Sequence, residues 1–193
     1  MNHPDKLKAN IASIIALDEE EWQHFWGFFE CIELKKNDCF LKEGQICDFV
    51  GFVNKGALVY FKMLDNGTEV TTDFAFENDW VTNNQSRLSN SPSLINIKAI
   101  EATEMLVIKN KDLSEIYIRL PKIERFGRIL IEQAFVRITR QSIDLQLFSA
   151  KERYEQLLLS SPEIIQRAPL YHIANYLGIA PKSLSRIRKE IFQ

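Results

Sequence analysis

The change in hydrophobic period along the chain is the feature that most restricts its fold. From about Glu33 to Ile108, apolar and polar residues alternate with a period of two, as strands with one buried face require. After Pro121, roughly 28 residues run to Phe148 without a proline, and their apolar positions recur at helical intervals. A chain with its strands first and its helices afterwards is predicted to be of the α+β class.

Turn residues divide the first part of the chain into short strands. Residues spaced two apart stand on both sides of residues 65–67. They are Val59, Phe61 and Met63 before the turn, and Val70, Thr72, Phe74 and Phe76 after it. The Asn66-Gly67 pair between them supplies the positive φ angles of a type I′ turn and predicts a β-hairpin. Glu43-Gly44 and Lys55-Gly56 indicate further turns, and residues 95–99 and 105–108 indicate the last strands. Many short strands at regular spacing predict an antiparallel barrel or roll.

Helical spacing appears on both sides of the predicted strands. Asp18 and Glu21 have the spacing of a capping box, and an aromatic stripe suited to core packing follows them: Trp22, Phe25, Trp26 and Phe29. In the long helix, two rows repeat every seven residues: Ile129, Val136, Ile143 and Ala150, and Ile131, Ile138 and Leu145. The two rows lie roughly 200° apart around the helix, so each must be buried against a different neighbour. We expect the barrel to cover one row and a second copy of the helix to cover the other, with Ile129, Val136 and Ile143 as dimerisation residues. Burial inside one subunit is the alternative.

Composition is that of a soluble globular protein, with 46% hydrophobic and 26% charged residues. No apolar run approaches the roughly 18 residues of a membrane span and the start lacks a signal-peptide core, so we expect a cytoplasmic protein without a membrane partner. The formal charge is −7 for residues 1–110, +2 for residues 111–150 and +3 for residues 151–193. A polyanion such as DNA would therefore be attracted by the C-terminal part.

Cysteine and histidine residues do not suggest a metal site. Cys31, Cys39 and Cys47 lack any Cys-x-x-Cys spacing, and we expect three reduced, packed thiols. His3 and His24 are remote from His172 in the sequence, which gives no ligand triad. We expect His172 on the outer side of its helix, exposed or close to a phosphate.

Residues 170–187 have the pattern of a helix-turn-helix. Ala174 allows its two short helices to approach closely, and Gly178 allows the tight turn between them. The helices pack on each other through five apolar residues: Ile173, Leu177, Ile179, Leu184 and Ile187. Pro181 suits the start of the second helix. The outward residues are the candidate DNA-binding residues: Lys182, Ser183, Ser185, Arg186, Arg188 and Lys189. Lys182 and Arg186 point the same way, which suits a helix lying in the major groove, and Arg186 could bind a guanine edge. Arg188, Lys189 and the two serine hydroxyls are better placed for phosphates. A helical hairpin with a solvated basic face is the alternative.

Nearly the whole chain resembles the CRP/FNR family of bacterial transcription regulators. The resemblance lies in residues 36–44 (Lys-x-x-x-Phe-x-x-Glu-Gly), in residues 55–58 (Lys-Gly-Ala-Leu), in residues 99–108, and in Leu184-Ser185-Arg186. It implies a double-stranded β-roll like that of cyclic-nucleotide-binding domains over residues 1–120, a long dimerisation helix over 121–148, and a winged-helix or helix-turn-helix domain over 149–193. It also implies that Arg186 reads a base and that RNA polymerase is a partner.

The phosphate-binding motif of that family is changed in this chain. By register from Ala99, the family's Gly-Glu pair falls on Thr82 and Asn83, and its Arg-containing triplet on Ser93, Leu94 and Ile95. Without an arginine for bidentate pairing to the phosphate, cyclic AMP binding in the usual way should be weak. Arg87 is the nearest cation, either solvated in the polar loop 83–87 or part of a pocket for another effector. No cofactor is certain, and the effector-pocket candidates are Thr82, Asn83, Arg87, Ser93 and Leu94.

These features predict a dimeric DNA-binding transcription regulator with a sensor roll. The alternative is a cyclic-nucleotide or small-ligand receptor module whose C-terminal helices bind a protein. An enzyme is not indicated, because the chain has no Gly-x-Ser-x-Gly, P-loop or His-Glu-x-x-His motif.

Overall fold

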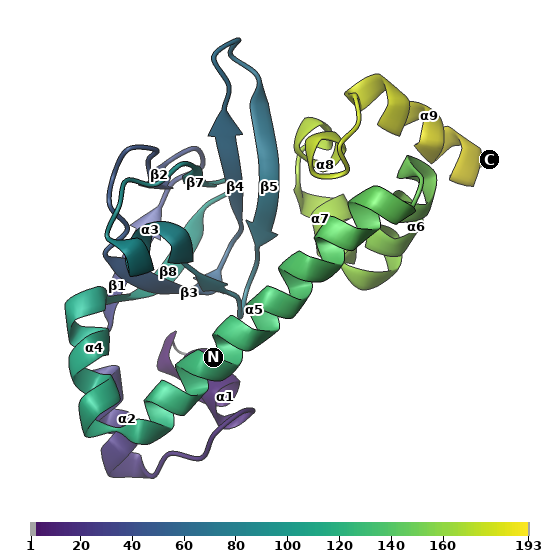
Figure 1. The fold of residues 1–193 in the computed structure, drawn as a ribbon. Coiled ribbons are helices and arrows are strands. Elements are labelled where there is room, and N and C mark those ends of the chain that lie inside the picture. Colours follow the sequence, from purple (N-terminus) through teal and green to yellow (C-terminus); the bar gives the residue numbers. More distant parts are fainter. Residues whose placement is uncertain (1–2, 193) are drawn as a thin grey trace.

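The computed structural model describes residues 3–192 and contains two antiparallel sheets packed as a roll (Figure 1). The first sheet has the strand order β1 (Glu30–Leu34), β8 (Thr103–Lys109), β3 (Phe49–Lys55) and β6 (Trp80–Val81). The second has the order β2 (Cys39–Leu41), β7 (Asn96–Ala99), β4 (Leu58–Met63) and β5 (Glu69–Ala75). Buried residues from both sheets, among them Val53, Leu58, Ile97 and Met105, form the core between them. The predicted roll is confirmed.

The β4–β5 hairpin forms where the alternation predicts it, with Met63 opposite Glu69. The type I′ turn is wrong, because Gly67 has a φ of +79° whereas Asn66 has no positive φ. The Gly67 amide donates to the Leu64 carbonyl and the Leu64 amide donates to the Thr68 carbonyl, each at 2.9 Å. The turn is therefore longer than two residues, and only its glycine needs the left-handed region.

Helices cover the outer face of the first sheet. They are α1 (His3–Ala12), α2 (Glu19–Trp26), α4 (Asn110–Arg119) and the first part of α5 (Pro121–Leu147), which pack on Phe52, Leu106 and Ile108. The Asp18–Glu21 capping box at α2 is confirmed, and Trp22 and Phe25 are buried as predicted. The expected polar loop is instead the short helix α3 (Asn84–Ser89), capped by the Asn83 side chain and ended by Asn90 in the left-handed region.

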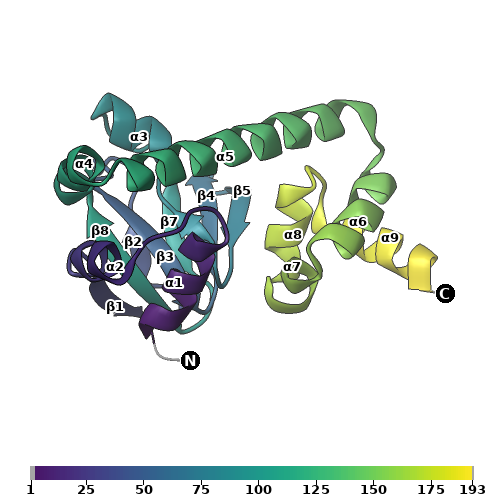
Figure 2. The same ribbon diagram turned by 90° about the horizontal axis from the view of Figure 1, so that it is seen from below.

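The long helix α5 carries the chain from the roll to the C-terminal helices (Figure 2). These are α6 (Ala150–Ser160), α7 (Pro162–Arg167), α8 (Leu170–Tyr176) and α9 (Pro181–Phe192). Within residues 3–192 no strand follows β8, so the expected winged helix has its helices here but no wing.

The face of α5 that packs on the roll differs from the expectation. Ile123 and Phe126 are buried and Leu130 is half-buried, whereas both predicted rows are largely exposed beyond residue 130. The prediction that the barrel covers one of the two heptad rows is therefore wrong. The buried positions follow the 3.6-residue period of an α-helix on a globular body, and the seven-residue rows lie on either side of them.

Candidate nucleic-acid interface

The turn between α8 and α9 is fixed by Gly178. This residue has a φ of +69°, and it follows α8 as the left-handed residue of a Schellman motif. The Gly178 amide donates to the Asn175 carbonyl at 2.9 Å, and the Ile179 amide donates to the Ala174 carbonyl at 3.0 Å. The sequence prediction of a tight turn at this glycine is confirmed.

One face of α9 packs on α8 and the other faces solvent. Leu184 and Ile187 are buried together with Ile173, Ala174 and Leu177, as the helix-turn-helix pattern predicts, and Ile179 is half-buried. Five of the six candidate DNA-binding residues are exposed and Ser183 is half-buried; the exposed ones are Lys182, Ser185, Arg186, Arg188 and Lys189. The face free for a partner thus carries four cations within two turns of helix.

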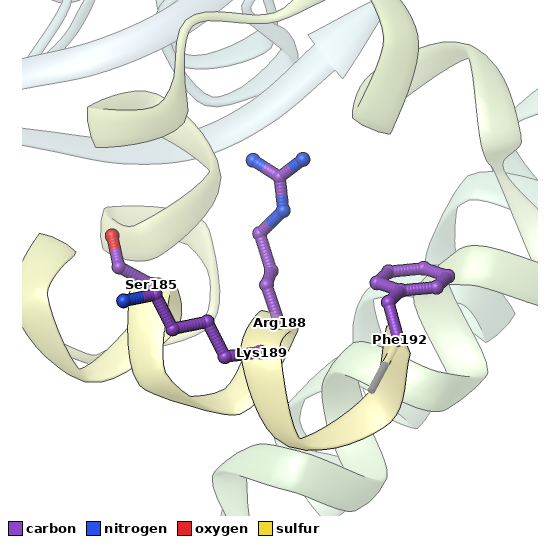
Figure 3. A pocket seen from close by; sticks show the side chains of 4 residues that line it. All are labelled: Ser185, Arg188, Lys189 and Phe192. Carbon is purple, nitrogen blue, oxygen red and sulfur yellow. The ribbon is translucent and has the colours of Figure 1, made fainter.

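The exposed side chains of α9 are only weakly held by one another. Arg186 Nε lies 3.8 Å from Glu190 Oε1, and both side chains are mostly exposed, so this pair contributes little. Ser185 Oγ donates to the Pro181 carbonyl at 3.0 Å. In Figure 3 the Lys189 side chain runs back along α9 toward Ser185, whereas Arg188 projects away from the helix. Glu190, four residues after Arg186, belongs to this surface and was not singled out from the sequence.

Helix α8 is docked on strand β5 of the roll through buried polar contacts. His172 Nδ1 and Thr71 Oγ1 are 2.6 Å apart, and Asn175 Nδ2 donates to the Glu69 carbonyl at 2.6 Å. The His172 side chain has 0% exposure, so the expected exposed position is wrong. Burial, with a smaller effect of the charge of Lys98, lowers the pKa of His172 to about 4. The ring is therefore neutral at pH 7.

An arginine at the end of α7 ties the C-terminal helices to the roll. Arg167 donates to both carboxylate oxygens of Glu77, at 2.6 and 3.0 Å, and also binds Glu101. Burial alone would raise the pKa of Glu77, but the hydrogen bonds from Arg167 lower it to about 2. At the other end, Arg153 Nη2 donates to the Leu177 carbonyl at 2.7 Å. The Arg167 contacts tie α7 to the roll, and the Arg153 contact ties α6 to the end of α8. Neither arginine was singled out from the sequence.

The five effector-pocket candidates do not converge on one site. Asn83 Nδ2 donates to Ser93 Oγ at 2.7 Å, and Ser93 Oγ donates to the Ile95 carbonyl at 2.7 Å, so these two buried side chains satisfy each other. Leu94 is 59% exposed. Thr82 and Arg87 line a separate cavity beside α4 and α5. Asn83 and Ser93, where the resemblance would place a phosphate motif, thus hydrogen-bond each other, and Arg87 is half-buried rather than solvated in a loop.

Potential metal ligands are dispersed. Residues 3–192 hold no group of three such side chains, and His24 packs edge-on against Phe28. The His3 side chain lies outside the described residues. Cys47 is buried, but Cys31 and Cys39 are exposed, so only one of the three thiols is packed as expected.

Among the described helices, none has the length and apolarity to cross a bilayer.

Comparisons with known proteins agree with this arrangement. The model of the cyclic nucleotide-binding domain family matches residues 31–119. The transcriptional activator protein Anr of Pseudomonas protegens is 25% identical over 165 residues, which cover 80% of this chain and 67% of Anr.

Solved structures match across the roll, the long helix and the C-terminal helices. FixK2 from Bradyrhizobium japonicum has a TM-score of 0.72 at 19% identity and covers 84% of each chain. The regulator CLP of Xanthomonas campestris, described as c-di-GMP responsive, has a TM-score of 0.70 at 14% identity and covers 90% of this chain and 91% of its own. Taken together, the comparisons show that residues 31–119 are similar to a cyclic nucleotide-binding domain, that the chain is similar in sequence to the activator Anr, and that its fold is that of FixK2 and CLP.

Proposed function

We propose that this protein is a cytoplasmic, homodimeric transcription regulator that binds two-fold-related DNA sites through α9 of each subunit. The observation that carries the proposal is the cationic outer face of α9, whose inner face is fixed on α8 by Leu184 and Ile187. The acidic first 110 residues would repel DNA, so the cationic face directs a duplex to α9.

Two roles divide the side chains of α9. Lys182 and Arg186 are four residues apart and share a face, and a guanidinium there can form two hydrogen bonds with a guanine edge in the major groove. Ser183, Ser185, Arg188 and Lys189 flank that face and suit phosphate contacts, which position the helix without reading sequence.

The dimer is proposed to form along α5. Four of its exposed apolar residues, Ile131, Phe135, Ile138 and Leu145, form a seam with alternating spacings of four and three residues, in which the small polar Ser142 fills the remaining position. That spacing is the one that keeps a seam facing a partner helix. The row of Ile129, Val136 and Ile143 is also partly exposed, but Arg140 occupies the intervening position and Ile129 is half-buried. The structure therefore favours the Phe135 seam over the row expected from the sequence.

A dimer of this kind would place two α9 helices in successive major grooves, about 34 Å apart. An effector that changes the pairing of the α5 helices would change that separation and hence the affinity. The activator name of the relative Anr supports RNA polymerase as a further partner.

The proposal is tested by selecting duplexes from a random DNA pool with the full-length protein and measuring affinities by fluorescence anisotropy. Arg186→Ala should lower affinity for the selected duplex by about ten- to a hundredfold and relax its sequence preference. Lys189→Ala should weaken binding to all duplexes and reduce the salt slope by about 1. Lys36→Ala, which removes an exposed cation of the roll, is the matched control and should change neither.

Two results would contradict the proposal. One is a pool without enrichment at low salt, and the other is an Arg186→Ala protein with unchanged affinity and preference. An affinity for a protein partner that hardly depends on salt would instead favour the receptor module.

A further inference from the structure

We propose that the cavity enclosed by α3, α4, α5 and the outer face of the first sheet binds a small organic monoanion, a carboxylate with a short apolar or aromatic body. The cavity measures about 100 Å³, and its walls are mainly apolar, with Trp80, Ile108, Phe126 and Leu130 among them. An engineered apolar cavity of roughly 150 Å³ holds benzene, so one ring is the upper limit for the body of the ligand and a short alkyl chain fits below it.

The cavity contains one cation without a counter-ion. Arg87 reaches it from the last turn of α3, where Nη1 donates to Asn110 Oδ1 at 3.0 Å and Nη2 donates to Asn84 Oδ1 at 2.9 Å. The buried Nε has no hydrogen-bond partner, and none of the ion pairs between described residues involves Arg87. Neutral amides orient the guanidinium but do not compensate its charge, so an anion that reaches it gains a charge-assisted hydrogen bond.

A second polar group stands at the same cavity. The Tyr117 hydroxyl packs over Gly127 of α5, in the space that any larger side chain at position 127 would occupy. Burial raises the pKa of Tyr117, so its hydroxyl stays protonated and can donate at neutral pH. One guanidinium and one phenol match the two oxygens of a carboxylate.

The cavity does not include Asn83 or Ser93 of the expected phosphate motif, although Thr82 lines it. The motif position is closed by the hydrogen bond between Asn83 and Ser93, whereas the cavity lies on the helical side of the first sheet. It is also smaller than the roughly 300 Å³ at which drug-sized ligands begin to fit, which excludes a nucleotide.

A ligand in the cavity would contact α5 directly and could shift its position. Ile131 and Ala134 line the cavity, and Ile131 also belongs to the proposed dimer seam. This coupling rests on the proposed function, but ligand binding does not, so the two can fail separately.

The test is calorimetric titration of the full-length protein with two carboxylates, benzoate and butyrate. Their uncharged analogues, benzyl alcohol and butanol, are titrated in parallel. Both carboxylates should bind at least tenfold more tightly than their alcohols. Arg87→Gln should remove that difference, and Ala134→Leu, which fills the cavity from α5, should remove binding of all four. Arg128→Gln, at an exposed position of α5 outside the cavity lining, is the control and should bind as the parent does.

The proposal is overturned if the carboxylates bind no more tightly than the alcohols, or if their affinity survives both Arg87→Gln and Ala134→Leu. Circular dichroism of each variant identifies any loss of fold, and Ala134→Leu tests the cavity without altering Arg87. DNA affinity is measured separately without ligand, so its absence would contradict the proposed function and leave the titrations interpretable.

Discussion

His172 is a titratable side chain buried where α8 meets β5. Its ordinary pKa is 6.5 and its pKa in the fold is about 4, because burial disfavours the imidazolium. A base with a lowered folded pKa gives its full stabilisation above pH 6.5 and loses it as the pH falls from 6.5 to 4. The contact between the roll and the helix-turn-helix therefore weakens in mild acid.

His172→Gln should remove this pH dependence. The parent protein should lose about 2 kcal/mol of unfolding free energy between pH 8 and pH 5 through His172, and the variant should lack that loss. Urea unfolding at a series of pH values measures the difference, and subtraction of the two curves cancels the other titrating groups. Parallel curves for the two proteins would show that His172 is not linked to folding.

Gly178 allows a backbone test at the turn. A Cβ there would meet Leu145 Cδ2 at 3.7 Å, an ordinary contact, so the cost of Gly178→Ala comes from its φ of +69° alone. We expect a loss of about 1 kcal/mol in unfolding free energy. Gly27→Ala is the control, because Gly27 has a φ of −60° that alanine adopts freely. Equal effects of the two substitutions in thermal unfolding would contradict the assignment.

At the scale of elements, the sequence predicted those whose signal is local. Alternation located the β4–β5 hairpin, the Asp18–Glu21 box located α2, and Pro121 marked the start of α5. Helix α3 was missed because its only apolar residue is Leu88, which gives no helical period, and its two boundary signals, Asn83 and Asn90, are also typical of loops.

Contacts between distant segments could not be derived from local patterns. The hydrogen bonds of His172 with Thr71 and of Asn175 with Glu69 join residues about a hundred positions apart, and no spacing rule connects them. The prediction that the roll covers one of the seven-residue rows of α5 was wrong for a related reason. A straight helix drifts by about 20° per heptad, so the face covered by the roll follows Ile123, Phe126 and Leu130 instead.

Arg167 should hold α7 and its neighbours on the roll. Arg167→Gln leaves Glu77 and Glu101 without their shared cation, and we expect a loss of about 1–3 kcal/mol together with faster amide exchange in α7 and α8. Arg119→Gln, which breaks only the exposed pair with Glu115, should cost under about 0.5 kcal/mol. Hydrogen exchange with mass spectrometry measures both. Unchanged exchange in Arg167→Gln would show that apolar packing alone maintains the docking.

At the scale of the molecule, charge and apolar surface are separated along the chain. The roll is acidic, the exposed face of α9 is cationic, and α5 between them carries uncovered apolar residues. A monomer would leave Phe135 at 70% exposure and Ile138 at 59%, side by side on one helix face. Exposed apolar surface of this extent is typical of an interface, and a second α5 with the same seam would bury it.

Phe135→Glu and Val136→Glu separate the two possible dimer faces. Both residues are similarly exposed, at 70% and 66%, and they differ by one position, which turns them about 100° apart around α5. Phe135→Glu should place two carboxylates at the centre of the seam and shift the protein to monomer at micromolar concentration, whereas Val136→Glu should remain dimeric. Sedimentation velocity distinguishes these outcomes without DNA. If Val136→Glu dissociates and Phe135→Glu does not, the row of Ile129, Val136 and Ile143 forms the interface. Because a dimer contacts two half-sites, the variant that dissociates should also lose affinity for a two-fold DNA site while keeping its affinity for a single half-site.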